Sequence, residues 1–212
     1  MTVVKSPLPD EALNAFLSSA GVVPYALTQS ASPRYSTLVT SLFLHGGFMH
    51  LIGNMLYLWI FGDNVEDRLG RLLYLVAYLL AGVAASLAQV YMDPLSRLPM
   101  VGASGAIAGV LGIYIVLYPT ARVRTVLMIL VIRLVELPAW IVLGFWFVLQ
   151  LFDGVASIGN TAQGGVAYFA HIGGFVLGLV LGALLRASQI RRAPPRGFGL
   201  HSARVCATLA ID

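Results

Sequence analysis

The sequence predicts an all-α fold, a polytopic bundle of transmembrane helices. Of its 212 residues, 58% are hydrophobic and only 10% are charged, and the mean hydropathy of +0.86 lies far on the apolar side of soluble domains. The apolar residues form long continuous runs and not the alternating pattern of a membrane barrel. Because lipid cannot satisfy open backbone groups, such runs are expected to cross the membrane as helices.

Five apolar runs approach the roughly 20 residues that a helix needs to cross a hydrocarbon core. We predict membrane spans at 47–62, 72–91, 103–118, 137–152 and 166–185. A further apolar run, 125–135, is too short to cross alone and contains Arg133. This run could re-enter the membrane, lie at its interface or begin a long helix broken near Pro138, and the sequence leaves these alternatives open.

The arginines are distributed unequally between the two sets of connections. The connections that follow spans one, three and five contain most of them, namely Arg68, Arg71, Arg122, Arg124, Arg186, Arg191, Arg192 and Arg196. The opposite connections, 92–102 and 153–165, contain only Arg97. The positive-inside rule therefore predicts a cytoplasmic C-terminus and an N-terminal segment outside. The net charge of +4 reflects topology, so we expect the lipid bilayer and not nucleic acid as a partner.

The chain divides into three predicted parts. Residues 1–46 contain no run long enough for a span and are expected to lie at or just above the outer membrane surface as an extramembrane segment and outer loop. Residues 47–186 form the predicted membrane domain. Residues 187–212 form a basic cytoplasmic tail that we expect to be disordered. Cys206 is the only cysteine, so no disulfide can form within the chain.

Four polar residues lie in the outer thirds of spans that run in the same direction. His50 and Asn54 share one face of the first span, Ser104 begins the third, and His171 lies in the fifth. Polar side chains are costly inside a membrane, so their shared depth indicates a recessed site that opens outward. A serine becomes nucleophilic when a base within hydrogen-bond reach takes its proton, and histidine suits this task near neutrality. We therefore interpret Ser104 and His171 as a catalytic dyad.

The surroundings of Ser104 predict a site for an oxyanion. The backbone amide of Ser104, the side-chain amide of Asn54 and His50 could all donate hydrogen bonds to it. Gly102 and Gly105 flank the serine, as expected where a helix begins abruptly with a free backbone N–H. Glycines also recur on the third and fifth spans and would let these helices approach closely, at Gly105, Gly109, Gly112, Gly174, Gly178 and Gly182. No acidic residue lies at the same depth in a span, so we predict a dyad and not a triad.

Three segments resemble a bacterial rhomboid protease: HGGFMHLIGNMLYLWIFGDNVEDRLG (45–70), GASG (102–105) and AHIGGFVLG (170–178). The resemblance covers roughly residues 35–186. It implies that Ser104 is the nucleophile, that His171 is the general base, and that the HxxxN pair His50 and Asn54 lines the oxyanion hole. It further implies that Gly102 and Gly105 complete the GxSG turn and that Gly174 lets the serine and histidine helices pack.

The same resemblance implies an activity and an address. The family hydrolyses peptide bonds in or beside transmembrane segments of membrane proteins, and it needs no metal or cofactor. We therefore expect transmembrane protein substrates and a location in a bacterial inner membrane.

Two features depart from the family pattern. The family core has six helices, whereas residues 1–30 contain nothing long enough to be the first, so the five predicted spans would be helices two to six. Ala108 stands where some members carry a tyrosine under the catalytic histidine. Three further polar residues lie near the outer end of the fourth span and in the following loop, where a gate or cap over the site would lie: Gln150, Asp153 and Gln163.

Other functions were compatible with parts of this pattern. A catalytically inactive rhomboid-like protein would bind transmembrane helices with the same fold. A small transporter or channel would have polar residues at the midplane and inverted repeats, and the sequence shows neither. Ser104 could be a packing residue and His171 a structural one. A metal bound by His45, His50 and His171 is disfavoured, because no carboxylate or cysteine joins them.

Overall fold

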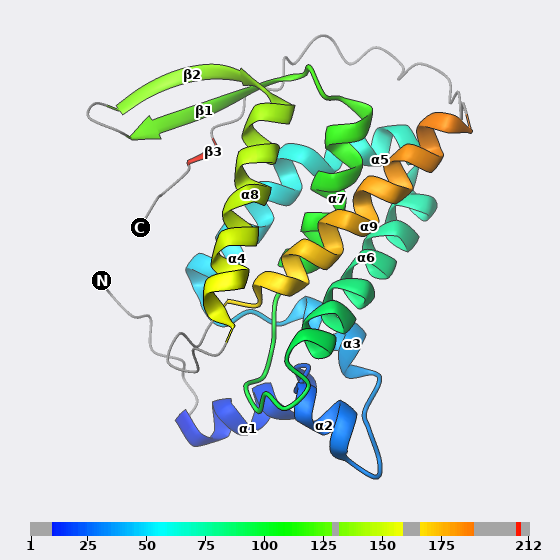
Figure 1. Cartoon of the computed structure of the whole chain (residues 1–212), viewed down its shortest axis with the longest axis vertical. Coiled ribbons are helices and arrows are strands. Elements are labelled where there is room, and N and C mark those ends of the chain that lie inside the picture. The colour runs from blue at the N-terminus through cyan, green and yellow to red at the C-terminus, as the bar shows by residue number, and fades with distance from the viewer. Residues whose placement is uncertain (1–9, 129–131, 159–165, 189–206, 209–212) are drawn as a thin grey trace.

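The structure is a helical bundle with a short β-hairpin at one end (Figure 1). This computed structural model describes residues 10–128, 132–158, 166–188 and 207–208. Its helices are α1 (Asp10–Ala20), α2 (Pro24–Gln29), α3 (Thr37–Thr40), the 3-10 turn η1 (Ser41–Phe43), α4 (Phe48–Tyr57), the π-helical turn η2 (Leu58–Gly62), α5 (Asp63–Leu69), α6 (Arg71–Met92), α7 (Ser104–Leu117), α8 (Ala139–Ser157) and α9 (Tyr168–Ala187). Its strands are β1 (Arg122–Met128), β2 (Ile132–Pro138) and β3 (Ala207–Thr208).

The five predicted spans correspond to helices of this bundle. Among the described residues, three helices, α6, α8 and α9, are long and apolar enough to cross a membrane. The run α4, η2 and α5 continues without a break through the first predicted span. α7 is apolar but has 14 residues, which rise about 21 Å and so fall short of a hydrocarbon core of about 30 Å. The prediction of a multi-pass helical membrane protein is confirmed.

α7 lies inside the bundle and not at its edge. Every residue from Gly105 to Tyr114 is buried. The helix packs against α6, α8 and α9, and its larger side chains, such as Ile107 and Leu111, belong to the main apolar core. In Figure 1 it lies between α8 and α9, with α6 beyond α9. The first residue of α7, Ser104, is therefore held by protein on several sides.

Close packing of α7 against α9 depends on glycines in both helices. A side-chain carbon placed on Gly174 would collide with the backbone oxygen of Gly105, and one on Gly178 would collide with the backbone oxygen of Gly109. A carbon on Gly105 would also lie 2.6 Å from the Cβ of Ala85 in α6. The small-residue contact predicted between the third and fifth spans is present in the structure.

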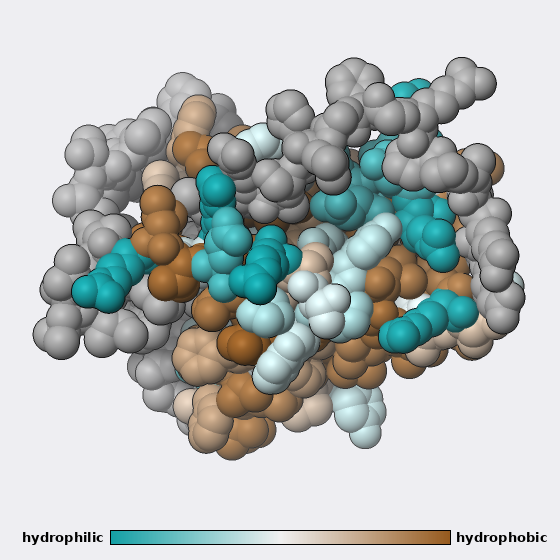
Figure 2. All heavy atoms as spheres, turned by 90° about the horizontal axis from the view of Figure 1, so that it is seen from above, coloured by the Kyte–Doolittle hydropathy of each residue, from teal (hydrophilic) through white to brown (hydrophobic). Residues whose placement is uncertain are grey.

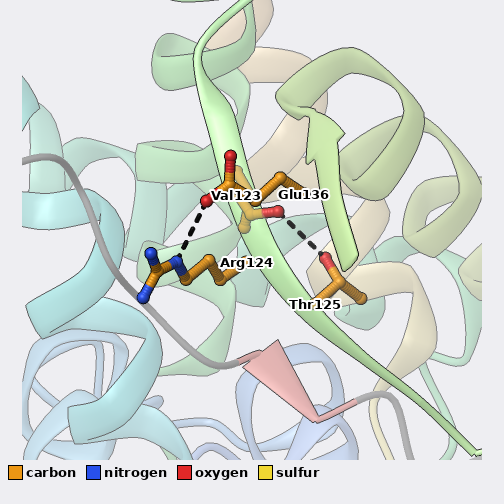
Figure 3. Close-up of polar contacts among 4 residues, drawn as sticks. All are labelled: Val123, Arg124, Thr125 and Glu136. Carbon is orange, nitrogen blue, oxygen red and sulfur yellow. Dashed lines mark hydrogen bonds and ion pairs between the residues drawn. The ribbon is translucent and has the colours of Figure 1, made fainter. Parts of the chain in front are cut away.

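Strands β1 and β2 pair antiparallel at the end of the bundle opposite the start of α7, which we call the hairpin end (Figure 1). Arg124 Nε donates a hydrogen bond to Glu136 Oε1 across the two strands at 3.1 Å (Figure 3). Val123 and Thr125 are buried while Arg122 is exposed, which is the two-residue alternation of a strand. The alternative that 125–135 begins a long helix broken near Pro138 is therefore wrong.

The third strand lies in the segment that the sequence predicts to be a basic tail. β3 pairs in parallel with β1, with Thr125 opposite Ala207 and Val126 opposite Thr208. Residues 189–206 and 209–212 lie outside the described residues, so the disorder expected of this tail stays a prediction.

The N-terminal segment packs at the other end of the bundle, which we call the Ser104 end (Figure 1). Between residues 10 and 46 each helix is shorter than a span. Val22 and Met100 exchange two backbone hydrogen bonds of 3.0 and 2.7 Å, and the Gly102 N–H donates to the Ser41 carbonyl oxygen at 3.0 Å. These bonds fix the segment that leads into α7. The residues before the first span therefore support the loop on which Ser104 depends.

Arginines gather at the hairpin end. Figure 2 looks onto this end and shows hydrophilic side chains among apolar ones. The described arginines in its connections are Arg68, Arg71, Arg122, Arg124, Arg133 and Arg186. At the Ser104 end, Arg34 and Arg97 are the described arginines, and the Arg97 guanidinium lies 4.4 Å from the centre of the Tyr25 ring. The charge asymmetry seen in the sequence is thus an asymmetry between the two ends of the fold.

Candidate active site

The structure brings Ser104 and His171 into contact. Ser104 begins α7 and His171 lies in the first turn of α9. Nε2 of His171 lies 2.8 Å from Oγ of Ser104, although the residues are 67 positions apart in sequence. This is the distance at which a hydroxyl donates to an imidazole nitrogen. Both side chains are only partly buried, so the pair is enclosed but not sealed.

Gly102 lets a second imidazole approach the same serine. A side-chain carbon on Gly102 would lie 2.7 Å from Nε2 of His50 and 3.7 Å from Oγ of Ser104. The φ of Gly102 is +128°, a conformation that side-chain-bearing residues rarely adopt. Glycine is therefore required here for its conformation and for its lack of a side chain. His50 and Ser104 border the same small space beside it.

A hydrogen bond at Nδ1 of His50 favours the tautomer of this ring that carries its proton on Nε2. Nδ1 of His50 accepts a long hydrogen bond of 3.4 Å from the Gly46 N–H. A neutral imidazole that accepts at Nδ1 carries its proton on Nε2. The N–H of this ring is thus available on the side of Gly102 and Ser104.

Asn54 contributes a buried donor without a partner. The residue is only 7% exposed, and its Nδ2 has no hydrogen-bond partner among the described residues. Leaving such a donor unsatisfied costs about 1–3 kcal/mol, so its presence needs an explanation. Asn54 lies one helical turn after His50 on the same face of α4, and α4 contacts α7. The donors of His50 and Asn54 would face a negatively charged oxygen that formed beside Ser104.

His45 completes the polar cluster from the loop before α4. Its ring packs edge to face against His50, with centroids 5.3 Å apart and planes at 74°. Burial, and secondly the neighbouring His50, lower the pKa of His45 below its ordinary value, so this ring is neutral at neutral pH. In the part of the chain that the structure describes, no three His, Cys, Asp or Glu side chains gather in a way that could hold a metal ion.

α8 supplies two contacts to His171 that the sequence did not assign. Oε1 of Gln150 lies 2.7 Å from Nδ1 of His171, and the Trp146 ring centre lies 6.1 Å from that of the imidazole. Trp146 and Gln150 are four residues apart and share one face of α8. A polar residue one turn after an aromatic residue, inside an apolar helix, is the signal that points to them.

The sequence also pointed to Asp153 and Gln163 as residues of a gate or cap. Asp153 is exposed on α8, and Gln163 lies outside the described residues. Gln150 is thus the one of the three that the structure places on the imidazole.

Comparison with known proteins agrees with the motifs. The Rhomboid domain family matches residues 32–188. Over 156 residues, the chain is 33% identical to Rhomboid protein 1, mitochondrial, of Saccharomyces cerevisiae, which covers 69% of this chain and 40% of that protein. Over 149 residues, it is 35% identical to Rhomboid protease GluP of Bacillus subtilis, covering 68% of this chain and 26% of that protein.

A chloroplast relative matches the chain over a similar length. The chain is 30% identical to Rhomboid-like protein 11, chloroplastic, of Arabidopsis thaliana over 158 residues, which is 72% of this chain and 53% of that protein. The chain spans about half or less of the length of these curated relatives. Since the family match covers most of the chain and includes every helix from α3 to α9, the chain belongs to the rhomboid family.

Proposed function

We propose that this protein is an intramembrane serine endopeptidase that hydrolyses peptide bonds in or next to transmembrane segments of membrane proteins. The observation that carries the proposal is the 2.8 Å contact between Ser104 Oγ and His171 Nε2. This contact lies at one end of a multi-pass helical bundle. A hydroxyl that already donates to an imidazole can lose its proton as it attacks a carbonyl carbon. The relative GluP is named a rhomboid protease.

The proposed reaction has two halves. Ser104 Oγ attacks the scissile carbonyl carbon while His171 Nε2 takes the hydroxyl proton. His171 then gives that proton to the leaving amine, and an acyl ester remains on Ser104. In the second half, water attacks the ester with His171 again acting as the base. The new carboxyl end leaves and the serine hydroxyl is restored.

Negative charge on the carbonyl oxygen would be met by three donors. The backbone N–H of Ser104 lies at the start of α7, where an amide has no carbonyl one turn earlier to bind. The buried Nδ2 of Asn54 and the Nε2–H of His50 are the other two. Donors of this kind act most strongly when they are already in place before charge develops. The unsatisfied amide of Asn54 fits this role because its partner would exist only during the reaction.

Labelling with a serine-directed fluorophosphonate tests the proposal. The purified protein is expected to form a covalent adduct at Ser104, located by mass spectrometry, because the reagent requires an activated hydroxyl. The His171→Ala variant is expected to lose the adduct. If the folded wild-type protein forms no adduct with fluorophosphonates or isocoumarins, the chain is a catalytically inactive family member that binds transmembrane helices.

Asn54→Leu is expected to lower the rate of peptide cleavage on the order of 10²- to 10³-fold, the usual loss when one oxyanion donor is removed. The substitution also removes an unsatisfied buried amide, so the thermal unfolding midpoint is expected to stay the same or to rise. Cleavage of a transmembrane reporter substrate in liposomes measures the first effect. Gly53→Ala is the control, because a side chain at this neighbouring position meets nothing within 4 Å. Wild-type activity in Asn54→Leu would rule out the donor role.

We also propose an orientation and an address for the protein. The arginine-rich hairpin end would face the cytoplasm together with the C-terminus, and the Ser104 end would face outward. The bacterial inner membrane is supported by the motif resemblance to bacterial rhomboid proteases. Transmembrane protein substrates and the lipid bilayer would be its partners.

A further inference from the structure

Both ring nitrogens of His171 have an oxygen partner in the structure. Nε2 lies 2.8 Å from the Ser104 hydroxyl oxygen of α7, and Nδ1 lies 2.7 Å from Oε1 of Gln150 in α8. The Trp146 ring, also from α8, packs beside the imidazole with the two planes at 37°. α8 therefore holds the ring through one polar atom and one aromatic face.

The partner on Nδ1 decides which nitrogen can act as a base. A side-chain carbonyl oxygen only accepts hydrogen bonds, so Nδ1 must carry the proton that it donates to Gln150. A neutral imidazole carries a single N–H, which leaves the lone pair on Nε2 facing Ser104. In the other tautomer Nε2 would point a proton at Ser104, and the ring could not take the proton of the serine.

We infer that Gln150 is a positioning residue, whose side-chain carbonyl holds His171 in the tautomer and orientation that accept the proton of Ser104. The inference rests on the proposed function, since it assigns a role within the same site. In soluble serine proteases an aspartate does this work. A carboxylate in a membrane-spanning helix is costly, whereas an amide oxygen accepts the same hydrogen bond without a charge.

A second glutamine provides a matched comparison. Oε1 of Gln89 in α6 accepts a hydrogen bond of 3.1 Å from the Phe169 backbone N–H. α9 has no side-chain cap of its own at this end, so Gln89 stabilises the start of the helix that carries His171. The hydrogen bond of Gln89 is to backbone and that of Gln150 is to the ring. Loss of Gln89 should therefore affect folding, whereas loss of Gln150 should affect the tautomer and orientation of the base, His171.

Kinetics of three variants test the inference. Gln150→Leu is expected to lower kcat on the order of 10- to 100-fold, the effect of leaving a buried donor unsatisfied. KM is expected to change less than about threefold, because the lost hydrogen bond orients the base and does not bind substrate. Gln89→Leu is expected to lower the thermal unfolding midpoint and to leave kcat of the folded protein near the wild-type value. A kcat within about threefold of wild type in Gln150→Leu overturns the inference.

Gln150→Glu keeps an acceptor at Nδ1 and provides a rescue. Its carboxylate stabilises the protonated ring, so the acidic limb of the pH–rate profile is expected to move to higher pH, and activity above that limb is expected to exceed that of Gln150→Leu. Among the described residues, His50 of α4 is the titratable side chain whose charge affects the protonation of His171, and His50 is unchanged in all these variants. A Gln150→Glu rate no higher than that of Gln150→Leu at every pH would contradict the inference.

Nitrogen NMR of the histidine rings separates this inference from the proposed function, because it needs no activity. The chain has four histidines, and the signal of His171 is identified by its loss in His171→Gln. The wild-type ring is expected to be neutral with its proton on Nδ1, and in Gln150→Leu the proton is expected to shift to Nε2. An unchanged tautomer in Gln150→Leu overturns the positioning role. A shifted tautomer in a protein that cleaves nothing supports positioning and contradicts the proposed function.

Discussion

Ser104→Ala and His171→Ala are each expected to abolish cleavage of a transmembrane reporter substrate by the purified protein in liposomes. Ser104→Ala removes the oxygen that attacks the carbonyl carbon, so no acyl ester can form. His171→Ala leaves the hydroxyl in place but without a base 2.8 Å away, and a neutral serine hydroxyl is a weak nucleophile. The rate is expected to fall at least about 10³-fold in each variant, given the usual size of these effects.

The double variant distinguishes a working pair from two separate contributions. Residues that act as one unit give strongly non-additive losses, so Ser104→Ala with His171→Ala is expected to be no slower than either single variant. Ser86→Ala is the matched control, since Ser86 is a buried serine of α6, and among the described residues it is Ser104 and not Ser86 that hydrogen-bonds His171 Nε2. Cleavage that persists in both single variants, while Ser86→Ala behaves as wild type, would refute the dyad.

The contact between Ser104 and His171 could be predicted from the sequence because two independent signals agree. Polar residues are costly in apolar spans, and these two occur at one depth in helices that run in the same direction. Glycines near both residues indicate helices that touch, and the structure places Gly105 against Gly174. Asn54 was predicted for the same reason, as a polar residue one turn from His50 in an apolar span.

Gln150 could not be assigned from the sequence, because its contact depends on how α8 is rotated against α9. That rotation is set by aromatic packing between the two helices. Phe147 stacks on Phe175 with centroids 4.6 Å apart and planes at 19°, and Trp146 lies 5.9 Å from Phe175. With this rotation, Gln150 reaches His171 and not lipid. Such pairings of large side chains have no fixed spacing in sequence, so only the position of Gln150 near the outer end of the span was predictable.

The hairpin was missed for a different physical reason. Residues 125–135 are apolar enough to favour a membrane location, and a single short apolar run does not distinguish a strand from a helix segment. The alternation of Arg122, Val123, Arg124 and Thr125 is a strand pattern, but a strand is stable only beside a partner. The partner is β2. Pro138 at the end of this strand suggested a break in a helix and so hid the strand pattern.

Gly174→Ala is expected to lower the free energy of unfolding by about 3 kcal/mol or more, because overpacking a close contact forces the backbone to move. The added carbon would collide with the backbone oxygen of Gly105, which cannot rotate away as a flexible side chain can. Gly144→Ala in α8 is the control, since its added carbon meets nothing within 4 Å. That variant is expected to be unchanged or slightly more stable, by up to about 1 kcal/mol from helix propensity. Thermal unfolding of the purified proteins in the same detergent compares them.

Gly174→Ala is also expected to lower the cleavage rate of the folded protein, because the collision lies one turn from the dyad. Pushing α9 away from α7 separates His171 Nε2 from Ser104 Oγ, and a misplacement of about 1 Å can cost on the order of 10² in rate. Gly182→Ala separates the two effects. Its added carbon would lie 2.9 Å from the Cβ of Val116, about two turns further along the same interface. It is expected to lower stability while the folded fraction still cleaves substrate. Equal losses of cleavage in both variants, at matched folded fractions, would mean that the α7–α9 contact acts on the fold as a whole and does not set the distance within the dyad.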